Sequence, residues 1–314
     1  MRGIRLTAET EGKDMRYTPT VAQIRLTDNG GMSYAIRLCD GSYIMIDGGE
    51  SDKDGSGSYE QNSRVLMNYL KRHTDGDIRI RCWFITHFHL DHIDHATDFL
   101  KAHSDVLRVD AFAYNHPGLD ERLRDEERIR DWECAMDKYP TALRRILKAG
   151  ETISFPGLEA EILLAEGVRA PENPADQNNI SAAIRFKFDT GRAFVVLGDC
   201  CTERLYALSD PASPRRRADE DIRCDVLQAA HHGLVMGNDK YINLNRTLYE
   251  RMSPSITFFP THPDRFSTHR CFTEPKYTDN VYLMESTKYY HHRITTVVSM
   301  DDLTVAIEDE GDLT

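Results

Sequence analysis

The stretch His87-Phe88-His89-Leu90-Asp91-His92 places four potential metal ligands within six positions. It directly follows residues 78–86, which first alternate and then become fully apolar, as expected for a buried strand. Imidazole nitrogens and a carboxylate at this spacing suit a divalent ion of the zinc, manganese or iron type. Two such ions, about 3.5–4 Å apart, could hold a water between them and lower its pKa. A loop that is histidine-rich by chance is the alternative, but packing does not explain this density of imidazoles.

Two further strand ends carry residues of the same kind. Asp199 follows the apolar run 194–197, and His231 follows the apolar run 226–230. Functional groups gather at the carboxyl ends of strands in layered α/β structures. A Gly-Asp pair alone is usually a turn. The agreement of three strand ends, rather than any one of them, predicts a shared metal site.

The order of these motifs resembles a known family. Asp47-Gly48-Gly49, residues 87–92, Gly198-Asp199 and His231-His232-Gly233 follow one another as in the metallo-β-lactamase fold superfamily. Residues 178–181 and the tandem histidines are similar, more loosely, to the hydrolase-like domain of DNA-uptake channel proteins of the ComEC type. The resemblance covers about residues 20–308. It implies an α+β fold, an αββα sandwich of two mixed β-sheets flanked by helices.

The resemblance also implies roles for single residues. One or two divalent ions are expected, zinc first, with manganese or iron as alternatives. The implied metal ligands are His87 and His89 for the first ion, Asp91, His92 and His231 for the second, and Asp199 as a bridge. The residues implied in catalysis are Asp91, Asp199 and His232. His232 would otherwise support a ligand or face the substrate, and the sequence alone allows it to exchange roles with His231.

Other residues are expected around the ligands. Asp47 resembles a carboxylate that orients a ligand histidine and fixes its tautomer. His95, one helical turn after His92, could ligate, orient or pack. His262 follows the apolar run 256–259, close to two arginines, and is expected to bind an anionic group at the pocket rim. The full set of residues expected to contact substrate is Asn178, Asn179, Ser181 and His262.

One departure from the family pattern concerns the first ion. Most members have a third histidine in the loop before the Gly-Asp pair, but residues 176–181 read Asp-Gln-Asn-Asn-Ile-Ser. His116 is a candidate replacement, although a plain loop residue is the simpler interpretation. The first site could instead be completed by water or an amide. Occupancy by one ion therefore stays open, as does a non-catalytic metal-binding module with a degraded first site.

The implied reaction is hydrolysis by a metal-activated water that Asp91 and Asp199 position for attack on an ester-type centre. The ComEC-type resemblance favours a phosphodiester. A lactone, thioester or lactam hydrolase would use the same metals. A flavodiiron-type oxidoreductase shares the fold, but that branch typically has glutamate where His89 stands.

Composition limits the partners. The 314-residue chain has 39 Lys and Arg against 51 Asp and Glu, a formal charge of −12. This charge repels polyanions, so nucleic acid is a less favoured partner than a small molecule or a phosphodiester, although bound divalent ions reverse the field locally. No apolar stretch approaches the ~20 residues that span a bilayer, and no secretory signal is evident. The 7 cysteines form no Cys-x-x-Cys pair. We therefore expect a cytoplasmic protein without membrane contact; its oligomeric state stays open.

The sequence pattern predicts one domain over residues 19–314, preceded by a polar segment at 1–18. Turn residues separate the runs 21–26, 33–38 and 43–46, which predicts a β-meander. Helical spacing follows at 63–73 and 94–103. Residues 119–148 are strongly charged and interrupted by Pro140, which predicts a helical insertion made of two solvated surface helices.

Overall fold

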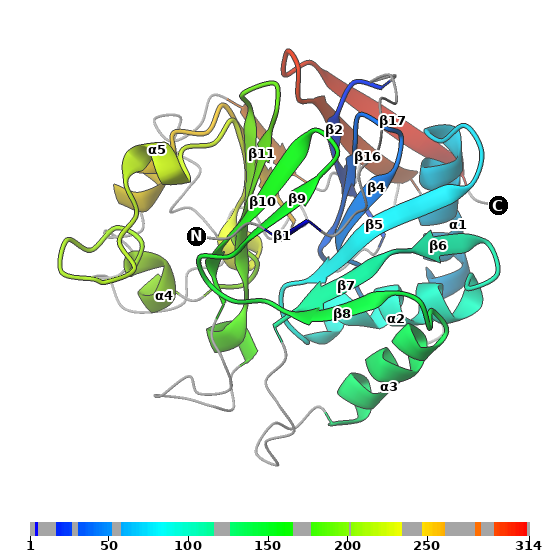
Figure 1. The fold of residues 1–314 in the computed structure, drawn as a ribbon. Helices are drawn as coiled ribbons and strands as arrows, with labels where there is room; N and C mark the ends of the chain where they lie inside the picture. The colour runs from blue at the N-terminus through cyan, green and yellow to red at the C-terminus, as the bar shows by residue number, and fades with distance from the viewer. Residues whose placement is uncertain are drawn as a thin grey trace.

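The computed structural model describes residues 4–5, 17–26, 31–51, 58–115, 126–165, 177–200, 202–233, 247–260, 280–283 and 292–312. Two β-sheets face each other, and helices cover their outer sides (Figure 1). The expected αββα sandwich of two mixed sheets is thus confirmed. His116 and His262, for which the sequence analysis gives roles, lie outside the described residues.

Within the described ranges one sheet has nine strands, in the order β17-β16-β2-β3-β4-β5-β7-β8, with β6 paired to β5. Antiparallel pairing joins β2, β3 and β4, which is the predicted meander. The strand bounds are β2 Thr20–Ile24, β3 Ser33–Arg37, β4 Tyr43–Asp47, β5 Ile78–Ile85, β6 Leu107–Val109, β7 Ala111–Tyr114, β8 Leu143–Ile146, β16 His292–Ser299 and β17 Val305–Asp312. The helices on its outer face are α1 Ser58–Arg72, α2 Leu90–Ala102 and α3 Glu126–Asp137.

The other sheet has eight strands among the described residues, in the order β1-β9-β10-β11-β12-β13-β14-β15. Its strand bounds are β1 Ile4–Arg5, β9 Thr152–Phe155, β10 Leu158–Leu164, β11 Ala183–Phe188, β12 Ala193–Val196, β13 Val226–Gln228, β14 Ile256–Phe259 and β15 Asn280–Leu283. Its short helices are η1 Gln177–Ile180, α4 Thr202–Tyr206, α5 Asp219–Ile222 and η2 Ala230–Gly233, and residues 247–252 are also helical.

Apolar side chains from the two sheets interlock between them. The rings of Phe84 in β5 and Phe186 in β11 lie 5.6 Å apart, and those of Tyr34 in β3 and Phe258 in β14 lie 6.0 Å apart. A second core fills the space between the nine-stranded sheet and α1, α2 and α3. Since β5 is covered on both faces, nearly all of its residues are buried, which explains its continuous apolar end.

The turn after β4 packs directly against α2. A Cβ atom on Gly48 would lie 2.7 Å from the backbone nitrogen and Cα of Ala96, so only glycine fits without displacement of the helix. The Gly48 N–H donates to the carbonyl of His92 at 2.6 Å, and the His95 N–H donates to that of Gly49 at 3.1 Å. These contacts fix the first turn of α2 beside the end of β4.

The prediction of two surface helices over residues 119–148 is wrong in its second half. Residues 126–137 do form helix α3, but Leu143–Ile146 form β8, a strand that pairs in parallel with β7. The strand closes an edge of the nine-stranded sheet, and Leu143 and Ile146 are exposed. An edge strand can carry Arg144 and Arg145 on accessible faces, so its charged residues gave the same sequence pattern as a solvated helix.

The structure also differs from the predicted element bounds near the metal motif. Helix α2 begins at Leu90 rather than at residue 94, so Asp91 and His92 lie in its first turn. Strand β15, at the edge of the eight-stranded sheet, was not predicted. Among the described residues, no helix has both the length and the apolar character needed to cross a membrane.

Candidate metal centre

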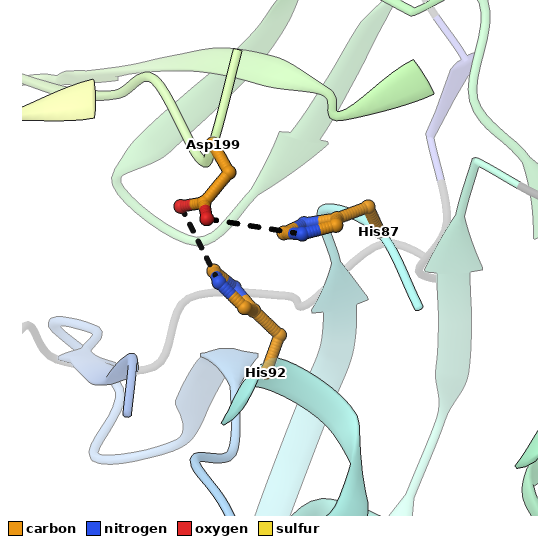
Figure 2. Close-up of side chains that lie close together, drawn as sticks. All are labelled: His87, His92 and Asp199. Atoms are coloured by element: carbon orange, nitrogen blue, oxygen red, sulfur yellow. Dashed lines mark ion pairs between the residues drawn. The ribbon is translucent and has the colours of Figure 1, made fainter. Parts of the chain in front are cut away.

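Four chain segments meet at one end of the sandwich. His87 follows β5, His92 lies in the first turn of α2, Asp199 follows β12, and His232 lies in η2 after β13. The side chains of His87, His92 and Asp199 point toward one another (Figure 2). The nine-stranded sheet and its helix α2 supply the first two, and the eight-stranded sheet supplies the others. The site is therefore assembled across both sheets.

One side of Asp199 is lined by Asp91, His92 and His232, here called the Asp91 side. Their ligand atoms all lie within 4.8 Å of one another. His232 Nε2 lies 3.0 Å from Asp91 Oδ2, and His92 Nε2 lies 3.3 Å from Asp199 Oδ1. Asp199 adjoins this group through His92 at 3.3 Å and His232 at 3.5 Å, so two imidazoles and two carboxylates gather here, which are donor types that suit a divalent ion.

The other side of Asp199 is lined by His87 and His89, here called the His87 side. His87 Nε2 lies 4.0 Å from Asp199 Oδ2 and 3.0 Å from His89 Nδ1. His87, His92 and Asp199 form a second compact group of possible ligands. Asp199 thus lies between two groups of donors, in the position expected of a bridging carboxylate.

Asp47 bonds directly to His92 and, through Thr86, is linked to His87. Its Oδ2 accepts hydrogen bonds from His92 Nδ1 and from the Thr86 hydroxyl, both at 2.8 Å, and its Oδ1 accepts from the Thr86 N–H at 2.8 Å. The Thr86 hydroxyl, having donated its proton, can accept from His87 Nδ1 at 3.1 Å. His232 Nδ1 donates to the carbonyl of Pro260 at 2.7 Å. With the proton of this network assigned to each Nδ1, the Nε2 atoms face His89, Asp199 and Asp91, and an ion would replace those contacts.

Two buried atoms test whether the residues fit a metal ion. His92 Nε2 and Asp199 Oδ1 are buried and lie 3.3 Å apart, and neither makes a well-directed hydrogen bond to a described residue. Buried polar atoms are rarely left without a partner, because desolvation then goes uncompensated. A divalent ion between them would satisfy both atoms. The donor set and these two atoms therefore fit a metal centre.

The carboxylates and the imidazoles of the centre stabilise one another's charged forms. Burial opposes a charged imidazole, but the carboxylates of Asp199 and Asp91 outweigh it, raising the pKa of His92 and raising that of His232 to about 10. Despite burial, the pKa values of both carboxylates fall below their usual range because His92 lies beside them. A divalent ion must displace the protons that these imidazoles hold, so its affinity rises with pH.

The residues expected to contact substrate are distributed differently. Ser181 is buried; its hydroxyl accepts from the Asp199 N–H at 2.9 Å and lies 3.5 Å from His87 Nδ1. Asn178 Nδ2 lies 3.5 Å from His231 Nε2. The structure gives Asn179 a place in η1 but does not describe its side chain, and His262 lies outside the described residues. Ser181 is thus placed to support Asp199 and His87 from within the protein.

His95 lies behind the centre rather than in it. Its ring is fully buried, its Nδ1 donates to the Gly48 carbonyl at 2.9 Å, and it packs near Tyr59 and Phe99. Of the roles left open by the sequence, packing and orientation fit this position better than ligation, because His95 belongs to neither group of possible ligands and its ring lies beside Tyr59 and Phe99. Burial lowers the pKa of His95 to about 4.

This low value predicts a pH-dependent contribution to stability. Between about 6.5 and about 4 the unfolded chain binds a proton at His95 that the folded protein does not, so acid favours unfolding. Across that window we expect the wild type to lose up to about 3 kcal/mol more unfolding free energy than His95→Asn. Asparagine keeps a donor for the Gly48 carbonyl. Urea unfolding of both proteins, metal-free, at several pH values measures the difference; parallel profiles would contradict the assignment.

Three residues of the centre were not found from the sequence. Thr86 bonds to Asp47 and His87, and Pro260 accepts from His232. The buried Arg204 donates from Nη1 to the carbonyl of Ser181 at 2.7 Å, which holds the turn beside Asp199. The position of Thr86 directly before His87 was a usable signal, whereas nothing in the sequence marked the other two.

No curated protein sequence matches the chain, but several solved structures are similar to it. Among solved structures, the metallo-beta-lactamase fold protein YhfI from Bacillus subtilis is 13% identical, with a TM-score of 0.48 and coverage of 86% of this chain and 98% of that chain. A diphosphatase from the PhnP family is 13% identical, with a TM-score of 0.46 and coverage of 84% and 94%. The diiron β-hydroxylase CmlA from Streptomyces venezuelae is 10% identical, with a TM-score of 0.44 and coverage of 77% and 44%.

A family comparison identifies the region that contains the histidine-rich stretch. Residues 26–167 match the model of the metallo-beta-lactamase superfamily, and this range includes Asp47 and residues 87–92. Asp199, His231 and His232 lie outside the matched range, and the structure brings them to the same place. Residues 26–167 are thus similar to the metallo-beta-lactamase superfamily, and the described chain has the metallo-beta-lactamase fold, with two mixed sheets between helices.

Proposed function

We propose that this chain is a metal-dependent hydrolase that cleaves a phosphodiester or a related ester. The observation that carries the proposal is the position of Asp199 between two groups of donors. Its Oδ1 lies 3.3 Å from His92 Nε2, and its Oδ2 lies 3.5 Å from His232 Nε2 and 4.0 Å from His87 Nε2. Divalent ions held there would lower the pKa of a bound water and stabilise negative charge that develops in the reaction.

The protein's own residues would orient the reacting groups. The side chain of Asp91 is 30% exposed, whereas those of His87 and His92 are fully buried. The centre is therefore open on the side of Asp91, where a substrate can approach. His232 holds the Asp91 carboxylate from behind, at 3.0 Å. Asp91 stays ionised at neutral pH, because its pKa is lowered, and can accept a hydrogen bond from the attacking water.

The substrate class rests on less evidence. The similarity of residues 178–181 and 231–233 to the ComEC-type branch supports a phosphodiester, and paired cation sites that share one carboxylate suit an in-line displacement at phosphorus. The charge of −12 opposes a long polyanion. We therefore propose a small phosphodiester before nucleic acid, and zinc before manganese or iron as the metal.

A substrate panel tests the proposal. Purified protein, loaded with zinc or manganese, would be assayed on bis(p-nitrophenyl) phosphate, p-nitrophenyl phosphate, a chromogenic lactone, nitrocefin and a thioester. We expect hydrolysis of the diester, stopped by a chelator and restored by metal. The matched control is Asp137→Asn, which alters an exposed carboxylate paired to Arg144.

The other outcomes are equally informative. Turnover of the lactone, lactam or thioester alone would indicate that the same centre acts on that class of substrate and not on a phosphodiester. Tight metal binding without turnover of any substrate would support a non-catalytic metal-binding module. Full activity in a preparation shown to be free of metal would refute a metal-dependent reaction.

A further inference from the structure

We infer that Gln228 is a positioning residue of the metal centre: its side chain holds the turn that carries Asp199 in a fixed place beside the turn that carries the tandem histidines, His231 and His232. The inference rests on the metal-dependent hydrolase proposed above and adds a residue to it that is not a ligand. The hydrogen bonds of Gln228 go to backbone groups beside the centre, so it acts on the ligands through the chain.

Gln228 projects into the space between the two sheets. It is the last residue of β13 and lies beside Val196 of β12 in a parallel register. Val226, two residues earlier, belongs to the apolar core between the sheets, and the alternation of side chains along a strand places Gln228 on the same face. Its exposed fraction is 0%. An amide in such a place is costly unless its donors and its acceptor are used.

The amide oxygen binds the turn that carries Asp199. Oε1 of Gln228 accepts from the N–H groups of Leu197 and Gly198, both at 2.8 Å. These two residues follow the end of β12, and the pairing of β12 with β13 ends at Val196 and Gln228. The side chain therefore supplies an acceptor where the neighbouring strand no longer provides one.

The amide nitrogen binds carbonyl groups on both turns. Nε2 of Gln228 donates to the carbonyl of Ala229 and, at 3.3 Å, to that of Gly198. It also lies 3.5 Å from Sδ of Met32, directly before β3 of the opposite sheet. Ala229 leads into η2, the turn of the tandem histidines. One amide group, which has both an acceptor and two donors, thus bonds to both turns.

The two turns are also joined directly. The N–H of His231 donates to the carbonyl of Gly198 at 2.9 Å, the same carbonyl that the amide nitrogen approaches. Both tandem histidines have left-handed backbones, with φ values of 49° and 55°. Residues other than glycine seldom adopt this conformation and keep it only where the surrounding structure imposes it. The bonds around Gly198 provide part of that support.

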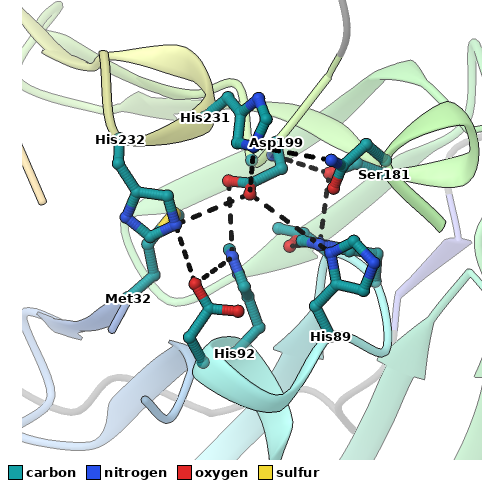
Figure 3. A network of polar contacts seen from close by, with 12 residues as sticks. Met32, His89, His92, Ser181, Asp199, His231 and His232 are labelled. Atoms are coloured by element: carbon teal, nitrogen blue, oxygen red, sulfur yellow. Dashed lines mark hydrogen bonds and ion pairs between the residues drawn. The ribbon is translucent and has the colours of Figure 1, made fainter. Parts of the chain in front are cut away.

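The positions of the turns decide where the ligand atoms meet. The Nε2 atoms of His231 and His232 lie 3.7 Å and 3.5 Å from Oδ2 of Asp199, and Figure 3 shows these three side chains converging. Aspartate and histidine side chains are short, so a shift of either turn moves its ligand atoms with it. Groups that orient ligands typically change metal affinity by about 10–100-fold when they are removed.

A purely structural role is the competing interpretation. Gln228 would then only satisfy backbone groups at two buried strand ends, and its loss would lower stability without altering the centre. Gln23 of β2 is a matched control, because it is 3% exposed and accepts from the Tyr34 hydroxyl at 3.1 Å. Methionine is about as long as glutamine but has no amide. Asparagine keeps the amide on a shorter side chain that cannot reach both turns.

Metal affinity and hydrogen exchange together distinguish the two roles. Gln228→Met, Gln228→Asn, Gln23→Met and Gln23→Asn would be compared with the wild type. Competition with a chromogenic chelator measures the affinity for Zn²⁺. In the metal-free proteins, NMR measures amide hydrogen exchange at Leu197, Gly198 and the strands of both sheets, and urea unfolding measures stability. The asparagine variants provide the comparison if a methionine variant does not fold.

We expect both Gln228 variants to bind Zn²⁺ about 10–100-fold more weakly than the wild type, and both Gln23 variants to bind it normally. In the metal-free Gln228 variants, exchange at Leu197 and Gly198 should accelerate by more than the loss of global stability explains. Wild-type Zn²⁺ affinity in the Gln228 variants, or exchange that accelerates equally throughout both sheets, would overturn the inference and leave the hydrolase intact. A wild type that binds no Zn²⁺ would instead refute the proposed function, on which the inference rests.

Discussion

Asp199→Asn is expected to abolish metal-dependent hydrolysis and to weaken divalent-metal binding by about 100-fold or more. Changes to residues that merely support a ligand already weaken metal binding by about 10–100-fold, and Asp199 contacts both sides of the centre. Asparagine has nearly the same shape but no charge, so the imidazoles of His92 and His232 lose their shared counter-charge. Competition with a chromogenic chelator measures the affinity, and the diester assay measures the rate.

The fold should survive this substitution, because the N–H of residue 199 still donates to the Ser181 hydroxyl. Circular dichroism and thermal unfolding in the absence of metal would verify that. The control variant Asp137→Asn, which changes an exposed carboxylate, should behave as the wild type in every assay. An Asp199→Asn protein that bound metal normally and hydrolysed the diester at the wild-type rate would remove the basis for a bridging carboxylate.

Asp47→Ala is expected to lower both stability and metal affinity, although Asp47 is not placed among the ligands. Its carboxylate is fully buried and accepts from the N–H and hydroxyl of Thr86 and from His92. Removing one partner of such a buried network costs about 3 kcal/mol of unfolding free energy. Loss of the orienting bonds should weaken metal binding by about 10–100-fold. Denaturant unfolding and chelator competition measure the two effects separately.

A matched variant separates charge from backbone conformation. Asp47 has a φ of 54°, which asparagine tolerates better than alanine does. Asp47→Asn should therefore keep more stability than Asp47→Ala, yet still lose metal affinity, since an amide nitrogen cannot accept from His92. Wild-type affinity in both variants would show that the tautomer of His92 is fixed in some other way.

Much of the architecture could be predicted because burial leaves a clear pattern. Strand β5 reads as an apolar run since it is covered on both faces, and the ligand-type residues after it have no packing explanation. Turn-type residues in the sequence, at 27–32 and 39–42, separated the predicted strands of the meander. By contrast, β8 lies at an edge and carries two arginines, so its composition did not distinguish a strand from a solvated helix.

The arrangement within the centre was less predictable than its existence. The order of motifs indicated which residues gather, but not which imidazole faces which carboxylate. That depends on the left-handed turn at His231 and His232, which the tertiary structure imposes. Arg204 likewise acts through the backbone carbonyl of Ser181, a contact that no local pattern encodes. These contacts form only when segments far apart in the chain come together, so no local sequence pattern predicts them.

The assembly of the centre from both sheets has a mechanical consequence. His92 and Asp199 are more than a hundred residues apart in the chain, and their side chains lie 3.3 Å apart. An ion gripping both would cross-link the two halves of the sandwich, and a covalent link spanning such a loop removes on the order of 4–5 kcal/mol of freedom from the unfolded chain. Within the described part of the chain, Cys39, Cys82, Cys134, Cys200 and Cys224 form no disulfide. A bound metal ion would then provide the kind of cross-link that a disulfide provides in other proteins. Removing the ion should therefore lower the stability of the sandwich as well as abolish hydrolysis.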